Sequence, residues 1–260
     1  MTRTSYIQLG NRAFGMGRYS QALEYFKKAL DEPAADPVRL GDLYGNIGNV
    51  YGAMGQTGEA VRFYEKAVEI LRRDEDYTRL GMTFVNIGNL YSDQGKHDTA
   101  LSYYKKGRLL LEQERKWDEL STLFGNMSLL SLRQSDVTAA LGYADQALDC
   151  AKHLKNPARM ADALHRLAKA QEADGHLKEA RRLSELAYDH FSHLRNELGC
   201  AMTLYHQAGL YEKLGDMKSA ADCLVRVVAI DEKYSLPKLA ENRKRLSELR
   251  SRLRPGFEKP

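Results

Sequence analysis

Two stretches of the sequence decide the fold: YGNIGNVY at residues 44–51 and FVNIGNLY at residues 84–91, which begin 40 residues apart. Each is followed by a glycine, Gly55 or Gly95, and then by an alanine, Ala60 or Ala100. Near-identity at so many matched positions indicates an internal repeat, and periods of this length are typical of solenoid proteins.

The same frame, carried along the chain, defines six repeat units. One register position is always alanine: Ala22, Ala60, Ala100, Ala140, Ala180 and Ala220. A second position is glycine in five units, at Gly17, Gly55, Gly95, Gly175 and Gly215, with Ser135 in the sixth. Apolar residues recur at helical spacing on both sides of this glycine, which can adopt the left-handed conformation of a helix C-terminus. Each unit is therefore predicted to be two amphipathic helices, A and B, joined by a tight turn. The small residues at the alanine column and at positions such as Gly48 should let the two helices approach closely.

The predicted domain is all-α. The six repeats should occupy residues 1–235, at approximately 3–36, 38–75, 77–115, 117–155, 157–195 and 197–235. A capping helix restarted by Pro237 should follow at 236–254, and a flexible tail at 255–260. The leucine stripe of the capping helix should pack on the sixth repeat. The alternative is a short dimerising coiled coil with Asn242 setting its register.

Composition narrows the class of protein. Apolar residues make up 43% and charged residues 28% of 260, and the net charge is +4. These values indicate a folded chain and give no sign of nucleic-acid binding. The N-terminus lacks the apolar run of a signal peptide, and no apolar stretch is long enough for a transmembrane segment. Three scattered cysteines suit a reducing compartment, so we expect a cytoplasmic location.

The repeat resembles the tetratricopeptide repeat family. In the second unit the signature positions are Tyr44, Ile47, Gly48, Tyr51, Ala60, Tyr64 and Ala67. The 40-residue period exceeds the usual 34 or so and resembles the long-repeat subgroup of kinesin light chains and Pins-type adaptors. The resemblance implies a right-handed α-α superhelix of six hairpins, with helix A of each hairpin lining a concave groove that binds a protein partner.

Asparagines mark the face of helix A that should line this groove: Asn11, Asn46, Asn49, Asn86, Asn89 and Asn126. Asparagine is a poor helix former, and its amide offers both a donor and an acceptor. A row of such amides can hold the backbone of an extended peptide, as a similar row does in peptide-binding relatives. The alternative is that these asparagines are solvated or support contacts between hairpins.

The same face becomes basic in the fifth and sixth repeats, where it carries His165, Arg166, Lys169, Tyr205 and His206. These residues should favour an acidic stretch of peptide or a terminal carboxylate. Alternatively, Arg166 and Lys169 belong to a solvated face on which Asp162 pairs with Arg166.

Other functions find little support. The relatives that clamp the acidic tail of cytosolic chaperones need basic residues where this chain has Ile7, Met82 and Asn86. No motif for catalysis, phosphate binding or metal binding is found, so we expect no catalytic residue, no cofactor, no metal and no small-molecule substrate. The predicted function is a protein-binding scaffold or adaptor. The alternatives are a sensor whose superhelix changes shape on binding a peptide, and a solenoid that self-assembles into a weak homo-oligomer.

Overall fold

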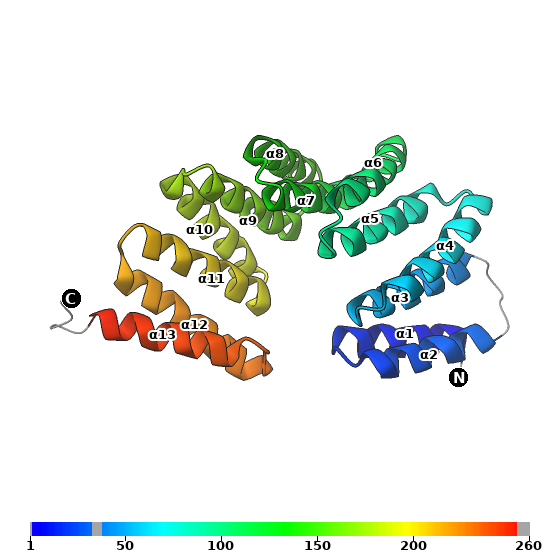
Figure 1. Ribbon diagram of the computed structural model, residues 1–260, viewed down its shortest axis with the longest axis horizontal. Coiled ribbons are helices and arrows are strands. Elements are labelled where there is room, and N and C mark those ends of the chain that lie inside the picture. The colour runs from blue at the N-terminus through cyan, green and yellow to red at the C-terminus, as the bar shows by residue number, and fades with distance from the viewer. Residues whose placement is uncertain (1, 33–37, 254–260) are drawn as a thin grey trace. The chain divides into compact units, whose positions relative to one another are not determined.

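The computed structural model describes residues 2–32 and 38–253, and within them the chain forms thirteen α-helices (Figure 1). The first six are α1 (Arg3–Gly15), α2 (Tyr19–Asp31), α3 (Val38–Ala53), α4 (Thr57–Arg73), α5 (Tyr77–Asp93) and α6 (His97–Gln113). The next six are α7 (Trp117–Arg133), α8 (Val137–His153), α9 (Pro157–Ala173), α10 (Leu177–His193), α11 (Glu197–Lys213) and α12 (Met217–Tyr234). The last is α13 (Leu239–Leu253). Odd-numbered helices up to α11 are the predicted A helices, and even-numbered ones are the B helices. The predicted tail at 255–260 lies outside the described residues.

The turn inside each hairpin has the predicted left-handed residue. All five turn glycines have positive φ, between 71° and 83°, and Ser135 adopts φ 60° at the same place. The amide after the glycine bonds back to the preceding helix, as Lys96 N does to the Tyr91 carbonyl at 2.9 Å. This is the six-residue bond of a Schellman motif.

The turn between hairpins repeats the same geometry without glycine. Glu75, Arg115, Lys155 and Arg195 between hairpins, and Ser235 between the last hairpin and α13, all have φ between 51° and 55°. The Asp76 amide bonds the Leu71 carbonyl at 3.0 Å, which is again the Schellman bond. Left-handed backbone at these polar residues was not predicted, since none of them favours it locally.

The core confirms the role of the small residues. Every alanine of the repeat column is fully buried. In the first three hairpins a glycine of helix A lies against an aromatic ring of helix B: Gly10 on Phe26, Gly48 on Tyr64 and Gly88 on Tyr104. A Cβ at Gly88 would lie 2.5 Å from the Tyr104 ring, so no larger residue fits without displacing the ring. The small residues set the distance between the two helices of a hairpin.

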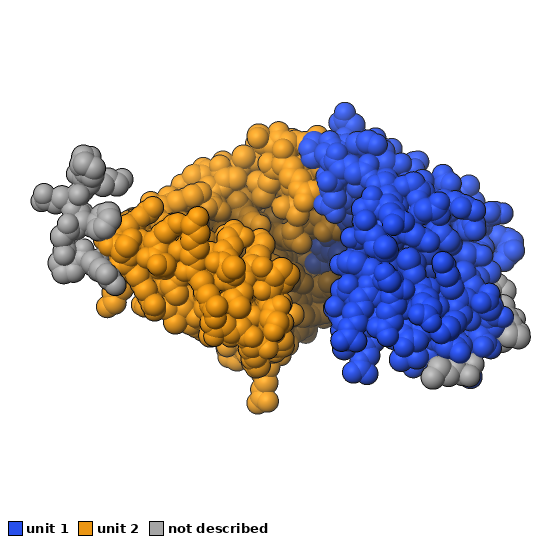
Figure 2. Space-filling view, turned by 60° about the horizontal axis from the view of Figure 1, so that its bottom comes forward, with its two compact units in different colours: residues 1–123 blue, residues 124–260 orange. Residues whose placement is uncertain are grey.

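The chain divides into two compact units, 1–123 and 124–260, which we call the N-terminal and C-terminal units (Figure 2). In the C-terminal unit the position equivalent to Gly88 is occupied by Ser128, Ala168 and Ala208. Ser128 uses its hydroxyl to donate a 2.8 Å hydrogen bond to the Ala140 carbonyl on α8. None of the described helices is long and apolar enough to cross a membrane.

The last helix packs on α12 through Leu246 and Leu249, which are buried. It begins at Leu239 and not at Pro237, which lies in the preceding turn. Asn242 donates a 2.7 Å hydrogen bond to the buried carboxylate of Asp231 on α12. Asn242 therefore stabilises the packing of α13 on α12 within the chain. This role argues against the alternative in which Asn242 sets the register of a coiled coil.

Candidate functional site

Two asparagines on the A helices of the N-terminal unit lie side by side. Asn46 on α3 donates a 3.2 Å hydrogen bond to the side-chain oxygen of Asn11 on α1. Asn11 is exposed and Asn46 is half-buried. Asn86, 40 residues after Asn46, is also half-buried, and its amide has no hydrogen-bond partner among the described residues. The A helices α1, α3 and α5 thus carry amide groups that a ligand could use.

Asn49 and Asn89 have a second role that the sequence did not reveal. Asn49 accepts a 2.6 Å hydrogen bond from the Tyr64 hydroxyl, and Asn89 accepts a 2.7 Å bond from the Tyr104 hydroxyl. Both rings are buried against the helix A glycines, and burial raises the pKa of Tyr64. A buried hydroxyl needs a partner, and the asparagine supplies it. The available signal was the pairing itself, since tyrosine follows asparagine by 15 residues in both hairpins.

Asn126 lies half-buried on α7, in the part of that helix that belongs to the C-terminal unit. Trp117 begins the same helix and is 37% exposed. The contribution of Asn126 to a binding surface stays a prediction.

The two histidines of the predicted site, His165 and His206, are buried rather than open to a groove. His165 on α9 is 4% exposed and His206 on α11 is 9% exposed, and their rings meet edge to face at 5.3 Å. Burial, aided by neighbouring His206, lowers the pKa of His165 to about 3. His165 therefore adds no positive charge at neutral pH, contrary to the expectation that it helps make this face basic.

A carboxylate on α9 joins the two helices through His206. Glu172 lies 2.8 Å from Nε2 of His206 and also accepts a 2.8 Å hydrogen bond from Lys213 Nζ. The bond with His206 is the main reason that the pKa of Glu172 falls to about 2. The Glu172 carboxylate thus stays charged and holds α9 against α11.

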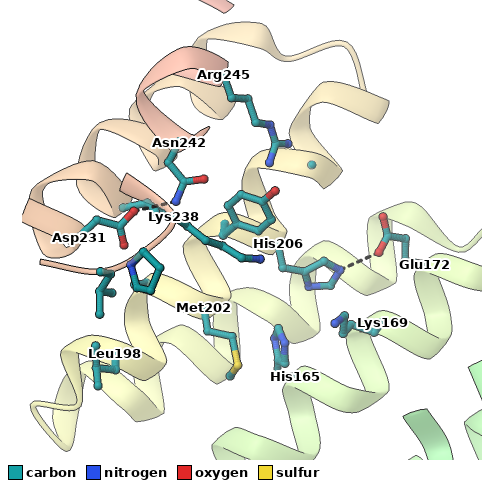
Figure 3. Close-up of a pocket in the computed structure, with 16 residues that line it drawn as sticks. His165, Lys169, Glu172, Leu198, Met202, His206, Asp231, Lys238, Asn242 and Arg245 are labelled. Carbon is teal, nitrogen blue, oxygen red and sulfur yellow. Dashed lines mark hydrogen bonds and ion pairs between the residues drawn. The ribbon is translucent and has the colours of Figure 1, made fainter. Parts of the chain in front are cut away.

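Lys169 and Tyr205 line a pocket of about 770 Å³ in the C-terminal unit (Figure 3). Its polar side includes Lys169, Glu172 and His206, and its apolar side includes Leu198 and Met202. Lys238, in the turn before α13, and Asn242 and Arg245, on α13, complete its lining. The sequence pointed to His165, Lys169, Tyr205 and His206 but missed the contribution of α13.

Cations surround Tyr205 in this pocket. The Arg245 guanidinium lies 4.8 Å from the centre of the Tyr205 ring, and Lys238 Nζ lies 5.9 Å from it. Arg245 also forms an ion pair with Glu212. Burial, followed by the nearby Arg166, lowers the pKa of Lys169. Positive charge therefore comes from lysine and arginine side chains on α9 and α13. Within the described residues, no group of three potential metal ligands is found.

Comparisons with known proteins agree with this architecture. Tetratricopeptide repeat models match residues 2–31, 39–113 and 203–234, which together exceed half of the chain. No curated protein matches the sequence.

Among solved structures, BtubC (BKLC) from P. vanneervenii is 16% identical, with a TM-score of 0.65, over 100% of this chain and 93% of that one. A Rap protein complexed with Competence and Sporulation Factor is 16% identical, with a TM-score of 0.68, over 95% of this chain and 74% of that one. The putative kinesin light chain repeats of Podosopora anserina are 20% identical, with a TM-score of 0.59, over 77% and 98%. Identities this low show a shared fold. The family matches and the helical hairpins together show that the chain belongs to the tetratricopeptide repeat family.

Proposed function

We propose that this protein is a non-catalytic scaffold that binds an extended segment of a partner protein along the faces of its A helices. The observation that carries the proposal is the set of amides on α1, α3 and α5. Asn46 and Asn11 contact each other, and Asn86 has no hydrogen-bond partner among the described residues. Half-buried amides without full pairing are costly unless a ligand or water completes their bonds.

An extended peptide fits this arrangement chemically. Its backbone presents an N–H and a carbonyl at every residue, and an asparagine amide can both donate to the carbonyl and accept from the N–H. Such recognition is independent of the peptide's side chains. It needs the asparagines at regular spacing, which the 40-residue repeat supplies for Asn46 and Asn86. We extend the proposal to Asn49, Asn89 and Asn126, and in the C-terminal unit to Arg166, Lys169 and Tyr205.

The test starts from a peptide selected from a displayed random library against the whole protein. Its affinity is then measured by isothermal titration calorimetry for the wild type, Asn46→Ala and Asn86→Ala. Each variant should weaken binding about fivefold, because a lost hydrogen bond to the peptide contributes about 1 kcal/mol. Gln113→Ala, at an exposed position on the B helix α6, is the matched control and should bind like the wild type. Unchanged affinity in both asparagine variants would overturn the proposal.

One similar structure bears on the alternative of a peptide sensor. The Rap protein was crystallised with Competence and Sporulation Factor, and it shares its fold with this chain. A sensor should change its dimensions when the selected peptide binds, whereas a scaffold should not. Small-angle scattering with and without the peptide separates the two, since only a sensor would show a changed radius of gyration.

A further inference from the structure

The carboxylates around the pocket of the C-terminal unit are already engaged. Glu172 accepts hydrogen bonds from His206 and Lys213. Asp231 is 3% exposed and accepts from Asn242. The carboxylate that pairs with Arg245 is Glu212. Each of these acids already has a hydrogen-bond or ion-pair partner.

Two lysines in the same pocket have no such partner. Neither Lys169 nor Lys238 forms an ion pair with a carboxylate of the described residues. They come from α9 and from the turn before α13, and Figure 3 shows the Lys238 side chain reaching toward His206, beyond which Lys169 lies. Burial, Arg166, Arg133 and, as the smallest contribution, Lys238 lower the pKa of Lys169, and Glu172 partly offsets them. Like charges that face one space favour an anion between them.

The opposite side of the pocket is apolar and open to solvent. Leu198 and Met202 lie one turn apart on α11 and are 51% and 42% exposed. Leu236 and Pro237 continue this surface from the turn before α13. Large apolar side chains that are exposed inside a pocket are a usual feature of ligand sites. The pocket thus combines unpaired positive charge with an apolar wall.

We propose that this pocket binds the C-terminal residue of the partner segment, with its carboxylate between Lys169 and Lys238 and its apolar side chain on Leu198 and Met202. Only the last residue of a chain carries a main-chain carboxylate and an apolar side chain on the same Cα. With an internal Asp or Glu, the apolar side chain would have to belong to a neighbouring residue. The inference rests on the proposed function and adds to it the direction and the end of the bound segment.

The test uses three small probes and the whole ¹⁵N-labelled protein. The probes are N-acetyl-Gly-Leu with a free carboxylate, N-acetyl-Gly-Leu amide, and N-acetyl-Asp-Leu amide, which has an internal carboxylate. Titration is followed by NMR chemical shifts of backbone amides in α11 and α13. The free acid should bind at millimolar concentration. Both amides should bind about tenfold more weakly, because they cannot place a main-chain carboxylate in a charge-assisted hydrogen bond with the lysines.

Variants assign the effect to the two lysines. Lys169→Met with Lys238→Met keeps much of the side-chain length but removes both charges, and should reduce the affinity for the free acid to that for the amide. Lys178→Met, at an exposed position on the B helix α10, removes a charge elsewhere and should change nothing. Circular dichroism and the melting temperature check that the double variant folds.

Three results would overturn the inference: no binding of the free acid, equal binding of acid and amide, or undiminished binding of the acid by the double variant. Tighter binding of the Asp-containing amide would assign the pocket to an internal acidic residue instead. None of these results touches the asparagine faces of the N-terminal unit. Failure here is therefore distinguishable from failure of the scaffold proposal, which is decided by Asn46→Ala and Asn86→Ala.

Discussion

The two compact units build the same helical hairpin with different residue pairs at the contact between helices A and B. In the N-terminal unit a glycine of helix A faces a large ring of helix B, as Gly48 faces Tyr64 and Gly88 faces Tyr104. In the C-terminal unit the equivalent pairs, 16 residues apart in the chain, are Ser128 with Ala144, Ala168 with Ser184, and Ala208 with Leu224.

The difference shows that the hairpin accepts pairs of different total size at this contact. Glycine with tyrosine has a larger summed volume than serine with alanine, and in every pair the residue on helix A is small. The choice has a consequence for the outer face. A buried tyrosine hydroxyl needs a partner, so Tyr64 and Tyr104 bring Asn49 and Asn89 onto helix A. In the fifth repeat helix B has no ring at this point, and the position equivalent to Asn89 is Lys169.

The largest effect should follow from breaking a glycine–ring pair. Gly88→Ala places a Cβ 2.5 Å from the Tyr104 ring. We expect a loss of about 2–3 kcal/mol in the free energy of unfolding, because an overpacked core must shift. Urea denaturation measures it. Gly142→Ala on α8 is the control, since a Cβ there meets nothing within 4 Å and alanine should stabilise the helix by up to about 1 kcal/mol.

The same pair allows a transplant between units. Gly88→Ser combined with Tyr104→Ala recreates the Ser128–Ala144 pair in the N-terminal unit. Because Tyr104→Ala removes the ring that a larger side chain at position 88 would meet, the double variant should be more stable than the two single effects predict, by about 1 kcal/mol or more. Strictly additive losses would contradict direct contact between the two positions.

A smaller loss should follow from removing the asparagine partner of a buried tyrosine. Asn89→Ala leaves the Tyr104 hydroxyl without its 2.7 Å hydrogen bond. We expect a loss of about 1–2 kcal/mol in the free energy of unfolding. Asn11→Ala is the matched variant, because its hairpin carries Phe26 and no hydroxyl, and its effect should stay within about 0.5 kcal/mol. Equal losses in the two variants would contradict a structural role for Asn89.

Acid should weaken the C-terminal unit through His165. The pKa of this histidine is lowered from 6.5 to about 3 in the folded protein. Below pH 6.5 His165 is protonated in the unfolded chain but stays neutral in the folded protein. The free energy of unfolding therefore falls as the pH falls. The expected slope is about 1 kcal/mol per pH unit. Urea denaturation between pH 6.5 and 5 avoids the further loss that Glu172 adds at lower pH, because its pKa is lowered from 4.5 to about 2. His165→Gln should flatten the slope, and an unchanged slope would contradict the assignment.

The smallest effect should come from the one hairpin turn without glycine. Ser135 adopts φ 60°, which is unfavourable for a residue with a Cβ. Ser135→Gly should therefore stabilise the protein by about 0.5 kcal/mol, less than the full conformational cost because glycine loses more entropy on folding. Gly175→Ala, at φ 82° in the next hairpin, should act in the opposite direction. Thermal unfolding of both variants measures the difference.

The fold was predictable because its signals are local. The alanine column and the turn glycines mark each hairpin in the sequence itself, and every alanine of the column is fully buried. The left-handed turns between hairpins were not predictable. Residues such as Arg115 and Lys155 adopt them because the helices on either side are fixed by packing, which overrides the local preference.

The candidate site was predictable only as a list of side chains on helix A. Its chemistry depends on contacts between distant residues. From the sequence, His165 is expected to add positive charge. Burial lowers its pKa, so the side chain is neutral at pH 7. Lys238 and Arg245 join Lys169 in one pocket because α13 folds back on α12, and the sequence shows a basic helix without showing what it covers.

The most direct test of the scaffold proposal is hydrogen–deuterium exchange of the whole protein with and without the selected peptide. Binding should slow the exchange of backbone amide hydrogens in the helices that the peptide covers, because it suppresses their local opening. We expect protection in the A helices α3 and α5 that exceeds any change in their partners α4 and α6. Protection confined to α4 and α6 would place the peptide on the B helices and contradict the role of the asparagines.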